Sequence, residues 1–179
     1  MSITAVALPT PVQEGMIYQS LVANDPRLYN EQLTLILHGT LDSALFQQSV
    51  DLLVLNHSVL RSSYVHEGVT RSQAVILRER GIGVQWIDLT GLDAGEQETR
   101  LLSIRDELQC RPFDFVKEPL LRFTVCSVAP DESVVVLGFT TLSWMAGAFR
   151  SSSRNYSTRT LGLLGGRSRS RSMMISPST

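Results

Sequence analysis

Apolar and polar residues alternate with a period of two along several short stretches of this chain, which indicates β-strands. The stretch EQLTLILH, residues 31–38, is the clearest, and Trp86 lies on a similar pattern, where we expect it in the core. A later stretch, VVVLGF at residues 134–139, is almost continuously apolar, as a buried strand would be. The strands predicted from these patterns cover residues 31–38, 60–65, 73–77, 84–87, 121–128 and 133–139.

Three other segments have the residue spacing of helices. Thr10, Pro11 and Gln13 combine a hydroxyl N-cap, a proline at the first helical position and a glutamine three residues after the cap. This capping box predicts a helix over residues 11–21. Two longer helices are predicted over residues 41–55 and 94–109, each with apolar residues on one face. The residues expected to face inward are Leu45, Phe46, Ser49, Val50, Leu53 and Val54 on the first of these, and Leu101, Ile104 and Leu108 on the second.

The order of these elements defines the fold class. Strands interleaved with two long helices place the chain in the α/β or α+β class, not among helical bundles or β-sandwiches. The length of 179 residues suits one domain, or a piece of one, with enough apolar residues to form a core.

The distribution of charge divides the chain into two parts. All 17 acidic residues lie at or before Glu132, whereas residues 150–179 contain six Arg and nine Ser. We therefore treat residues 1–139 as a globular body. Residues 140–179 form a Ser/Arg/Gly-rich tail that we expect to be disordered.

Cysteine usage and hydropathy indicate the cellular setting. Cys110 and Cys126 lack the spacing of a metal site or a disulfide framework, so both are expected to be reduced, buried thiols. The sequence has neither the regions of a signal peptide nor a run of the roughly 20 apolar residues that a membrane helix needs. These observations favour a cytoplasmic protein without a membrane partner.

No cluster of residues in the body suggests a catalytic or metal site by itself. His38, His57 and His66 have no carboxylate or cysteine at a metal-ligand spacing and are expected to be surface or structural residues. Gly81 and Gly83 lack the lysine and the helix cap of a phosphate loop and are expected in a turn. No serine lies in a nucleophile-elbow pattern.

The tail allows a second interpretation, because arginine-rich segments such as RSRSRS, residues 167–172, bind nucleic-acid phosphates. The tail has no lysine and few aromatic residues, and no RNA-binding motif lies elsewhere in the chain. A solvated tail without a nucleic-acid partner is therefore favoured. A binding module with a basic tail stays open as the alternative.

Four segments together resemble the condensation domain of nonribosomal peptide synthetases, in that family's order. LPTPVQEGMIYQSL, residues 8–21, resembles the opening helix motif, in a variant with QEGM. YNEQLTLILHG, residues 29–39, resembles the first strand. Residues 41–65 resemble the long helix that follows, with NHSVLRSSY where the family has RHxxLRTxF. RPFDFVKEPLLRFTV, residues 111–125, resembles the segment with PFDL and PLLR.

The resemblance implies a chloramphenicol-acetyltransferase-like N-terminal lobe, incomplete, with a mixed sheet and two long helices. Members join two thioesters held by carrier proteins, so carrier proteins are the expected partners. Their phosphopantetheine lies on the partner, and no cofactor is expected on this chain. The QEGM variant resembles the subgroup that accepts a donor ending in a D-residue.

The family's signature, HHxxxDG, follows the strand after PLLR, and its second His lies in a tunnel between two lobes. This chain has TTLSWMAG there, residues 140–147. Trp144, Met145 and Ala146 are necessarily encoded TGG ATG GCN, and the frame that begins on the last base of the Trp codon reads Asp-Gly. In that frame Thr140 and Thr141, both ACN, allow two His codons, so the signature fits positions 140–146. We therefore interpret the sequence after Phe139 as out-of-frame translation.

With this interpretation, the chain is an inactive fragment, and we assign it no catalytic residue and no metal site. Arg61 and Arg122 are candidates to pair with the signature's Asp in an intact relative, and a packing role is the alternative for both. Asp114 is expected to be a structural turn residue.

Without a second lobe, strand edges including residues 134–139 are expected to be unpaired, which favours poor solubility and self-association. An acyltransferase of the same superfamily that uses no carrier protein is a further alternative.

Sequencing of the DNA and of the transcript across codons 135–150 tests the interpretation of the reading frame. We expect one additional base before codon 140, followed by an open frame through the His-His and Asp-Gly codons. If that base is absent from both molecules, the 179-residue chain is a real but inactive remnant, and any function would have to come from binding alone.

Overall fold

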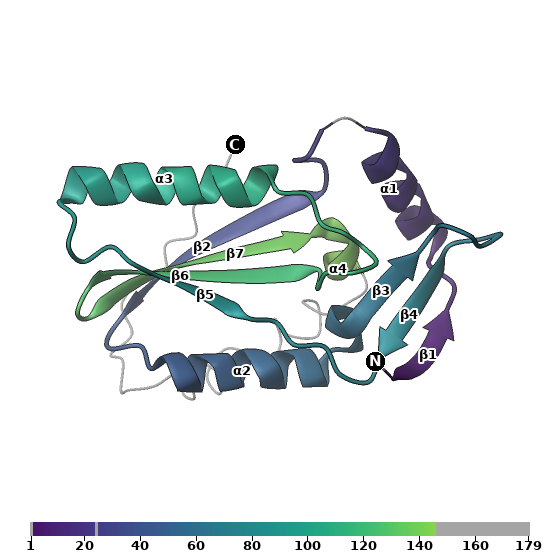
Figure 1. Cartoon of the computed structure of the whole chain (residues 1–179), viewed down its shortest axis with the longest axis horizontal. Coiled ribbons are helices and arrows are strands. Elements are labelled where there is room, and N and C mark those ends of the chain that lie inside the picture. The colour runs from purple at the N-terminus through teal and green to yellow at the C-terminus, as the bar shows by residue number, and fades with distance from the viewer. Residues whose placement is uncertain (1, 24, 146–179) are drawn as a thin grey trace.

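Two β-sheets and the helices around them form the described part of this computed structural model, residues 2–23 and 25–145 (Figure 1). The strands of the larger sheet, in spatial order, are β2 (Asn30–His38), β7 (Glu132–Thr140), β6 (Leu121–Ala129) and β5 (Val84–Asp88). Those of the smaller sheet are β1 (Ile3–Ala7), β4 (Gln73–Leu77) and β3 (Ser62–Val65).

The larger sheet is mixed, as the resemblance implied. β7 runs antiparallel to both β2 and β6, whereas β5 and β6 are parallel. A parallel pair needs a long connection, because the chain must return to the starting edge of the sheet. Helix α3 (Ala94–Cys110) supplies that connection between β5 and β6.

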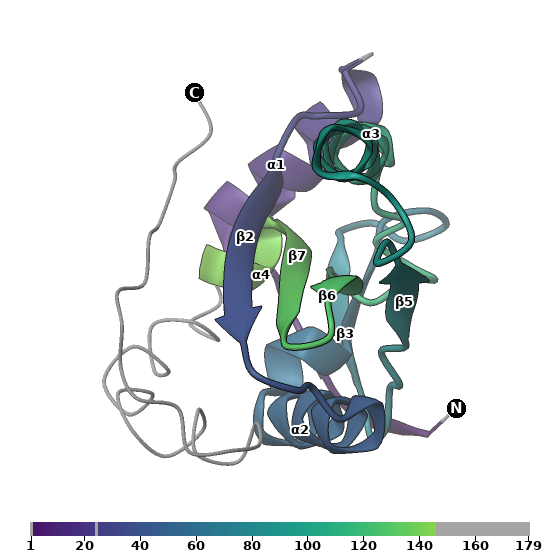
Figure 2. The same ribbon diagram turned by 90° about the vertical axis from the view of Figure 1, so that its left-hand side faces the viewer.

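The two long helices cover opposite faces of the larger sheet (Figures 1 and 2). Helix α2 (Ser43–Asn56) packs on one face, where Val135 and Leu137 of β7 meet Phe46 and Val50. On the other face, Val134 and Val136 join Ile104 of α3. Successive residues of β7 thus enter two different cores, which explains why its sequence is continuously apolar.

The shorter helices lie near the junction of the two sheets. Helix α1 (Pro11–Val22) has the predicted capping box, with the Gln13 N–H donating to Thr10 Oγ1 at 3.3 Å and the Thr10 N–H donating to Gln13 Oε1 at 2.9 Å. A 3₁₀ helix, η1 (Ser58–Arg61), precedes β3, and the short helix α4 (Thr141–Met145) follows β7. One sequence prediction is corrected here, because the strand predicted over residues 60–65 begins only at residue 62. One strand, β1, was not predicted.

Burial corrects three further predictions, those for Trp86, Leu45 and Cys110. Trp86 is 37% exposed, because β5 lies at the edge of the sheet, where the indole packs edge-on against Phe46 with ring centroids 5.8 Å apart. Leu45 of α2 is 45% exposed, whereas Phe46, Val50 and Val54 are buried as predicted. Both cysteines are free thiols; Cys126 is buried, but Cys110 is only half-buried.

The predicted open edge at residues 134–139 is wrong. β7 is paired along its whole length on both sides, with β2 and with β6, and its residues from Ser133 to Thr140 are buried. The unpaired edges of the described larger sheet are those of β2 and β5.

The predicted boundary of the disordered tail also changes. Thr140 is the last residue of β7, and residues 141–145 form α4. The remainder of the predicted tail lies outside the described residues. In the described ranges, no helix is long and apolar enough to span a membrane.

Replacement of Leu121 by alanine tests the described core. Leu121 is 1% exposed and packs in the core under α2, so Leu121→Ala should lower the free energy of unfolding by about 3 kcal/mol through lost contacts and a residual cavity. Urea unfolding followed by circular dichroism measures this. Leu102→Ala is the control, because Leu102 is 56% exposed on α3 and its loss should cost less than about 0.5 kcal/mol. Equal losses for the two variants would contradict the assigned core.

Candidate functional site

The candidate site is the carboxyl end of β7. The resemblance places the signature HHxxxDG there, and this chain has TTLSWMAG instead. The Thr140 side chain is 1% exposed, whereas that of Thr141 is half-buried. The Thr141 N–H donates to the carbonyl oxygen of Tyr29 at 3.0 Å, which continues the pairing between β2 and β7 by one residue. Ser143 Oγ then donates to the Thr140 carbonyl at 2.7 Å in the only turn of α4. Position 140 therefore points into the core, and position 141 is the more accessible of the two.

A separate apolar cluster surrounds this end of the strand. Its buried members are Met16, Ile17, Tyr64, Phe113, Phe115, Leu120 and Leu142. Gln13 connects two of the elements involved, since its Nε2 donates to the Tyr64 hydroxyl at 3.2 Å while its Oε1 caps α1. Burial raises the pKa of Tyr64, which therefore stays a neutral phenol at physiological pH. Gln13, within the QEGM segment, thus fixes α1 against β3.

The described side chains at the carboxyl end of β7 and the start of α4, at positions 140, 141 and 143, offer only hydroxyl groups. Residues 140–145 carry no carboxylate, imidazole or amine, so they offer no general base near neutral pH. The three histidines belong to other elements. His38 ends β2 and pairs with Glu132 at 3.2 Å, His57 caps the C-terminus of α2, and His66 follows β3. The prediction that they are surface or structural residues agrees with these positions, and no metal-ligand cluster occurs in the part of the chain that the structure describes.

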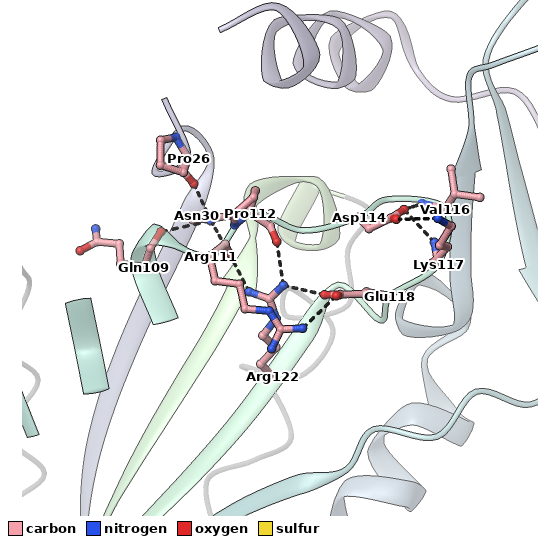
Figure 3. A network of polar contacts seen from close by, with 10 residues as sticks. All are labelled: Pro26, Asn30, Gln109, Arg111, Pro112, Asp114, Val116, Lys117, Glu118 and Arg122. Carbon is pink, nitrogen blue, oxygen red and sulfur yellow. Dashed lines mark hydrogen bonds and ion pairs between the residues drawn. The ribbon is translucent and has the colours of Figure 1, made fainter. Parts of the chain in front are cut away.

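Arg122 is the most highly connected of the predicted candidates (Figure 3). Its guanidinium donates to the carbonyl oxygens of Arg111 at 2.7 Å and Pro112 at 2.8 Å. It also pairs with Glu118 at 2.6 Å and lies 3.9 Å from the centre of the Phe113 ring. The side chain is 13% exposed. Arg122 therefore fastens the loop between α3 and β6, which contains the PFDF segment, to strand β6.

The electrostatics of Glu118 reflect this arrangement. Burial raises the pKa of the Glu118 carboxyl, but hydrogen bonds and charges from Arg122 and Arg111 outweigh burial and hold the pKa below its usual value. Glu118 therefore stays ionised and keeps its partners at neutral pH. Arg111 contributes the second ion pair, at 2.9 Å, from a side chain that is 60% exposed.

Asp114 occupies a turn in the same loop, as predicted. Its Oδ1 accepts hydrogen bonds from the backbone N–H groups of Val116 and Lys117, both at 3.0 Å (Figure 3). These bonds, chiefly the one from Lys117, lower the pKa of Asp114 against the opposing effect of burial. The residue organises the loop backbone.

Arg61 has packing partners as well. Its guanidinium donates to the carbonyl oxygens of Val54 at 3.2 Å, Leu77 at 2.9 Å and Arg78 at 2.8 Å. It thereby joins the end of α2 to the end of β4. These contacts support the packing alternative for Arg61, and pairing of either arginine with a signature Asp stays a prediction.

Arg80 is a structural residue that sequence analysis missed. It is 8% exposed, and its Nη1 donates to the Ser62 carbonyl at 3.0 Å and to Ser63 Oγ at 2.7 Å. Burial lowers its pKa, while the charges of Asp114 and Glu118 act in the opposite direction. In the sequence it stands in the polar run RERG, which gives no sign of burial. The residue next to the turn expected at Gly81 and Gly83 is thus a buried cation.

A cavity of about 440 Å³ lies beside the PFDF loop. The end of α1, the chain that leads into β2 and the connection between β3 and β4 complete its wall. The polar side chains that line it are Ser20, Asp25, Asn30, His66, Glu67, Asp114 and Lys117. The cavity combines carboxylates with one lysine and one imidazole, so no single ligand charge is favoured.

Comparison with known proteins places this geometry in a family. The family model described as "Condensation domain" matches residues 4–139. A linear gramicidin synthase of Brevibacillus parabrevis is 34% identical over 122 residues, which are 68% of this chain and 2% of that protein. Surfactin synthase subunit 2 of Bacillus subtilis is 30% identical over 135 residues, which are 75% of this chain and 4% of that protein. The chain therefore spans a small fraction of the curated relatives it matches.

Solved structures share the fold. The starter condensation domain of rhizomide synthetase RzmA aligns with a TM-score of 0.67 and 18% identity, over 78% of this chain and 34% of that chain. The four-domain nonribosomal peptide synthetase holo-AB3403, bound to AMP and glycine, aligns with a TM-score of 0.71 and 15% identity, over 87% of this chain and 12% of that chain. These alignments confirm the predicted fold class. In each of them, this chain covers only part of the solved chain.

Replacement of Arg122 tests the role of the loop anchor. Arg122→Met keeps much of the side chain's apolar volume but leaves Glu118 and two carbonyl oxygens without their main donor. The free energy of unfolding should fall by about 2–3 kcal/mol, the range for bonds to a charged group. Arg111→Met is the matched control, because Arg111 is exposed and its ion pair should contribute less than about 1 kcal/mol. Similar losses in the two variants, measured by urea unfolding, would exclude the anchoring role.

Proposed function

Because this chain belongs to the condensation domain family of nonribosomal peptide synthetases, we propose that it is an N-terminal part of a domain that forms a peptide bond between two carrier-protein-bound thioesters. The observation that carries the proposal is the family match over residues 4–139. That range contains α1, both long helices and all of β7 except its last residue, Thr140.

The proposed reaction is attack of an acceptor amine on the thioester carbonyl of the donor. The new C–N bond forms as the C–S bond breaks; the thiol of the donor's carrier protein leaves, and the amine gives up one proton. A positioned imidazole contributes about 10² to 10⁴ in rate to such proton transfer. The chain has threonine at both positions 140 and 141, so we propose that it has no condensation activity by itself.

We further propose that the codons after Phe139 are read out of frame. The family match stops at residue 139, and the alternative frame encodes Asp-Gly at positions 145–146 and allows His-His at positions 140–141, which is the spacing of the family's HHxxxDG. The local geometry supports this placement, because position 140 is buried and position 141 is accessible. The second position of a His-His pair would thus be the one able to meet substrate.

The proposed partners are carrier proteins, one presenting the donor and one presenting the acceptor. A synthetase of this kind would work in the cytoplasm, where its thioester substrates are made. An acyltransferase without carrier proteins is less well supported, because the relatives that match the chain are peptide synthetases. The basic tail has no counterpart in the family match, so a nucleic-acid function has no further support.

An assay with loaded carrier proteins tests this function. Two proteins are compared: the 179-residue chain, and the domain read through with one base added before codon 140. With a donor and an acceptor on separate carrier proteins, mass spectrometry should detect the condensed product only for the restored domain.

The matched control is the restored domain with alanine encoded at position 141. Its rate should fall by about 10² to 10⁴ if the imidazole acts as proposed. Product formation by the 179-residue chain at the rate of the restored domain would overturn the proposal of inactivity. Absence of product from a folded restored domain, with each of several donor and acceptor pairs, would count against the proposed reaction.

A further inference from the structure

The outer edge of β2 is open in the described part of the chain. β2 pairs with β7 on one side, and no other described strand pairs with it (Figure 2). All nine residues of β2 are exposed or half-buried, whereas eight of the nine residues of β7 are buried. A strand of this length therefore presents a full row of backbone groups at the margin of the sheet.

The register with β7 identifies which backbone groups point outward. The Tyr29 carbonyl accepts from Thr141 N, and Gly39 N donates to the Asp131 carbonyl at 2.6 Å, so the odd-numbered residues bond to β7. In an antiparallel pair the bonds alternate, so the N–H and C=O groups of Gln32, Thr34 and Ile36 face away from β7. These even-numbered residues form the free edge.

This edge lacks the features that protect natural sheet edges. Exposed edges usually carry lysine, proline or a bulge, which prevent pairing with another chain. The sequence NEQLTLILH contains neither lysine nor proline, and its register with β7 is unbroken. Ile36 is 59% exposed on the face that carries Gln32, whose Nε2 bonds to the Arg105 carbonyl of α3 at 2.6 Å. The other edge strand, β5, has only five residues.

We propose that β2 pairs antiparallel with β2 of a second copy of this chain, about a two-fold axis at Leu35. In this register Leu33 lies opposite the second copy's Leu37, and Thr34 lies opposite its Ile36. Both copies then place their leucines on the face covered by α2, where Leu33, Leu35 and Leu37 already pack against the core. A shift by two residues would keep the leucines on this face but would set Leu37 opposite Glu31 or Leu33 opposite Gly39, so the proposed register is the one that matches all three leucines.

A second copy fits the edge because a two-fold contact uses the same surface twice. The backbone N–H and C=O groups of Thr34 bond to those of the second copy's Ile36. The same pair forms again on the other side of the axis, so the two halves of the contact are identical. Glu31, the one acidic residue of β2, falls at opposite ends of the paired strands and does not oppose itself. The half-buried leucines become covered, and the two sheets become continuous.

Sedimentation of the 179-residue chain over a range of concentrations tests the dimer. We expect a species of twice 19.8 kDa that dissociates on dilution. Thr34→Lys combined with Ile36→Lys places lysine opposite lysine at two positions, and the dissociation constant of the dimer should rise at least about tenfold. Leu52→Lys combined with Leu55→Lys adds the same charge to the exposed face of α2 and should leave the dimer unchanged.

A charge-swapped variant tests the register and does not depend on loss of folding. Thr34→Lys combined with Ile36→Glu sets each new lysine opposite a new glutamate, so the dimer should form again. A monomeric charge-swapped variant would overturn the proposed register. A wild-type chain that stays monomeric at all concentrations, or aggregates that the double lysine variant leaves unchanged, would overturn the proposal as a whole.

Discussion

The placement of β7 between β2 and β6 is the constraint on which the rest of the described structure depends. Its backbone is bonded on both sides, and its side chains alternate between the core under α2 and the core under α3. Both long helices pack on it from opposite faces of the sheet. The candidate site lies at the carboxyl end of the same strand, and the open margin of the sheet lies one strand away. The position of β7 therefore determines where the two cores, the candidate site and the open edge lie.

The sequence predicted elements well where a repeating pattern of burial exists. The capping box of α1, the apolar face of α2 around Phe46, Val50 and Val54, and the apolar run in β7 all have direct local causes. β1 escaped prediction because all five of its residues are exposed, so it has no alternation to detect. The order of strands was also beyond prediction, since an apolar run shows burial but not which strand lies beside it. That is why β7 was placed at an edge and Trp86 in the core.

The sequence likewise predicted only part of the candidate site. The segment PFDFVKEPLLR was identified from its resemblance, and the turn role of Asp114 followed from its residue type. The anchoring of the loop by Arg122 depends on carbonyl oxygens ten and eleven residues away in sequence, which only the folded chain brings together. Arg80 had no sequence signal, because it stands in the polar run RERG. Its burial depends on contacts with Ser62 and Ser63, which lie 18 and 17 residues away in sequence. Sequence motifs thus locate a site, while its supporting contacts come from tertiary structure.

The pairing of β2 with β7 also has a consequence for synthesis of the chain on the ribosome. Asn30 pairs with Thr140, so β2 leaves the ribosome about 100 residues before its partner does. At the usual elongation rate of about 5–20 residues per second, β2 is without β7 for about 5–20 s. Loop closure over such a distance is entropically costly, so the large sheet forms late and after the local helices. During that interval the leucines of β2 are exposed to other nascent chains, and chaperones that bind extended apolar segments have their longest opportunity to act.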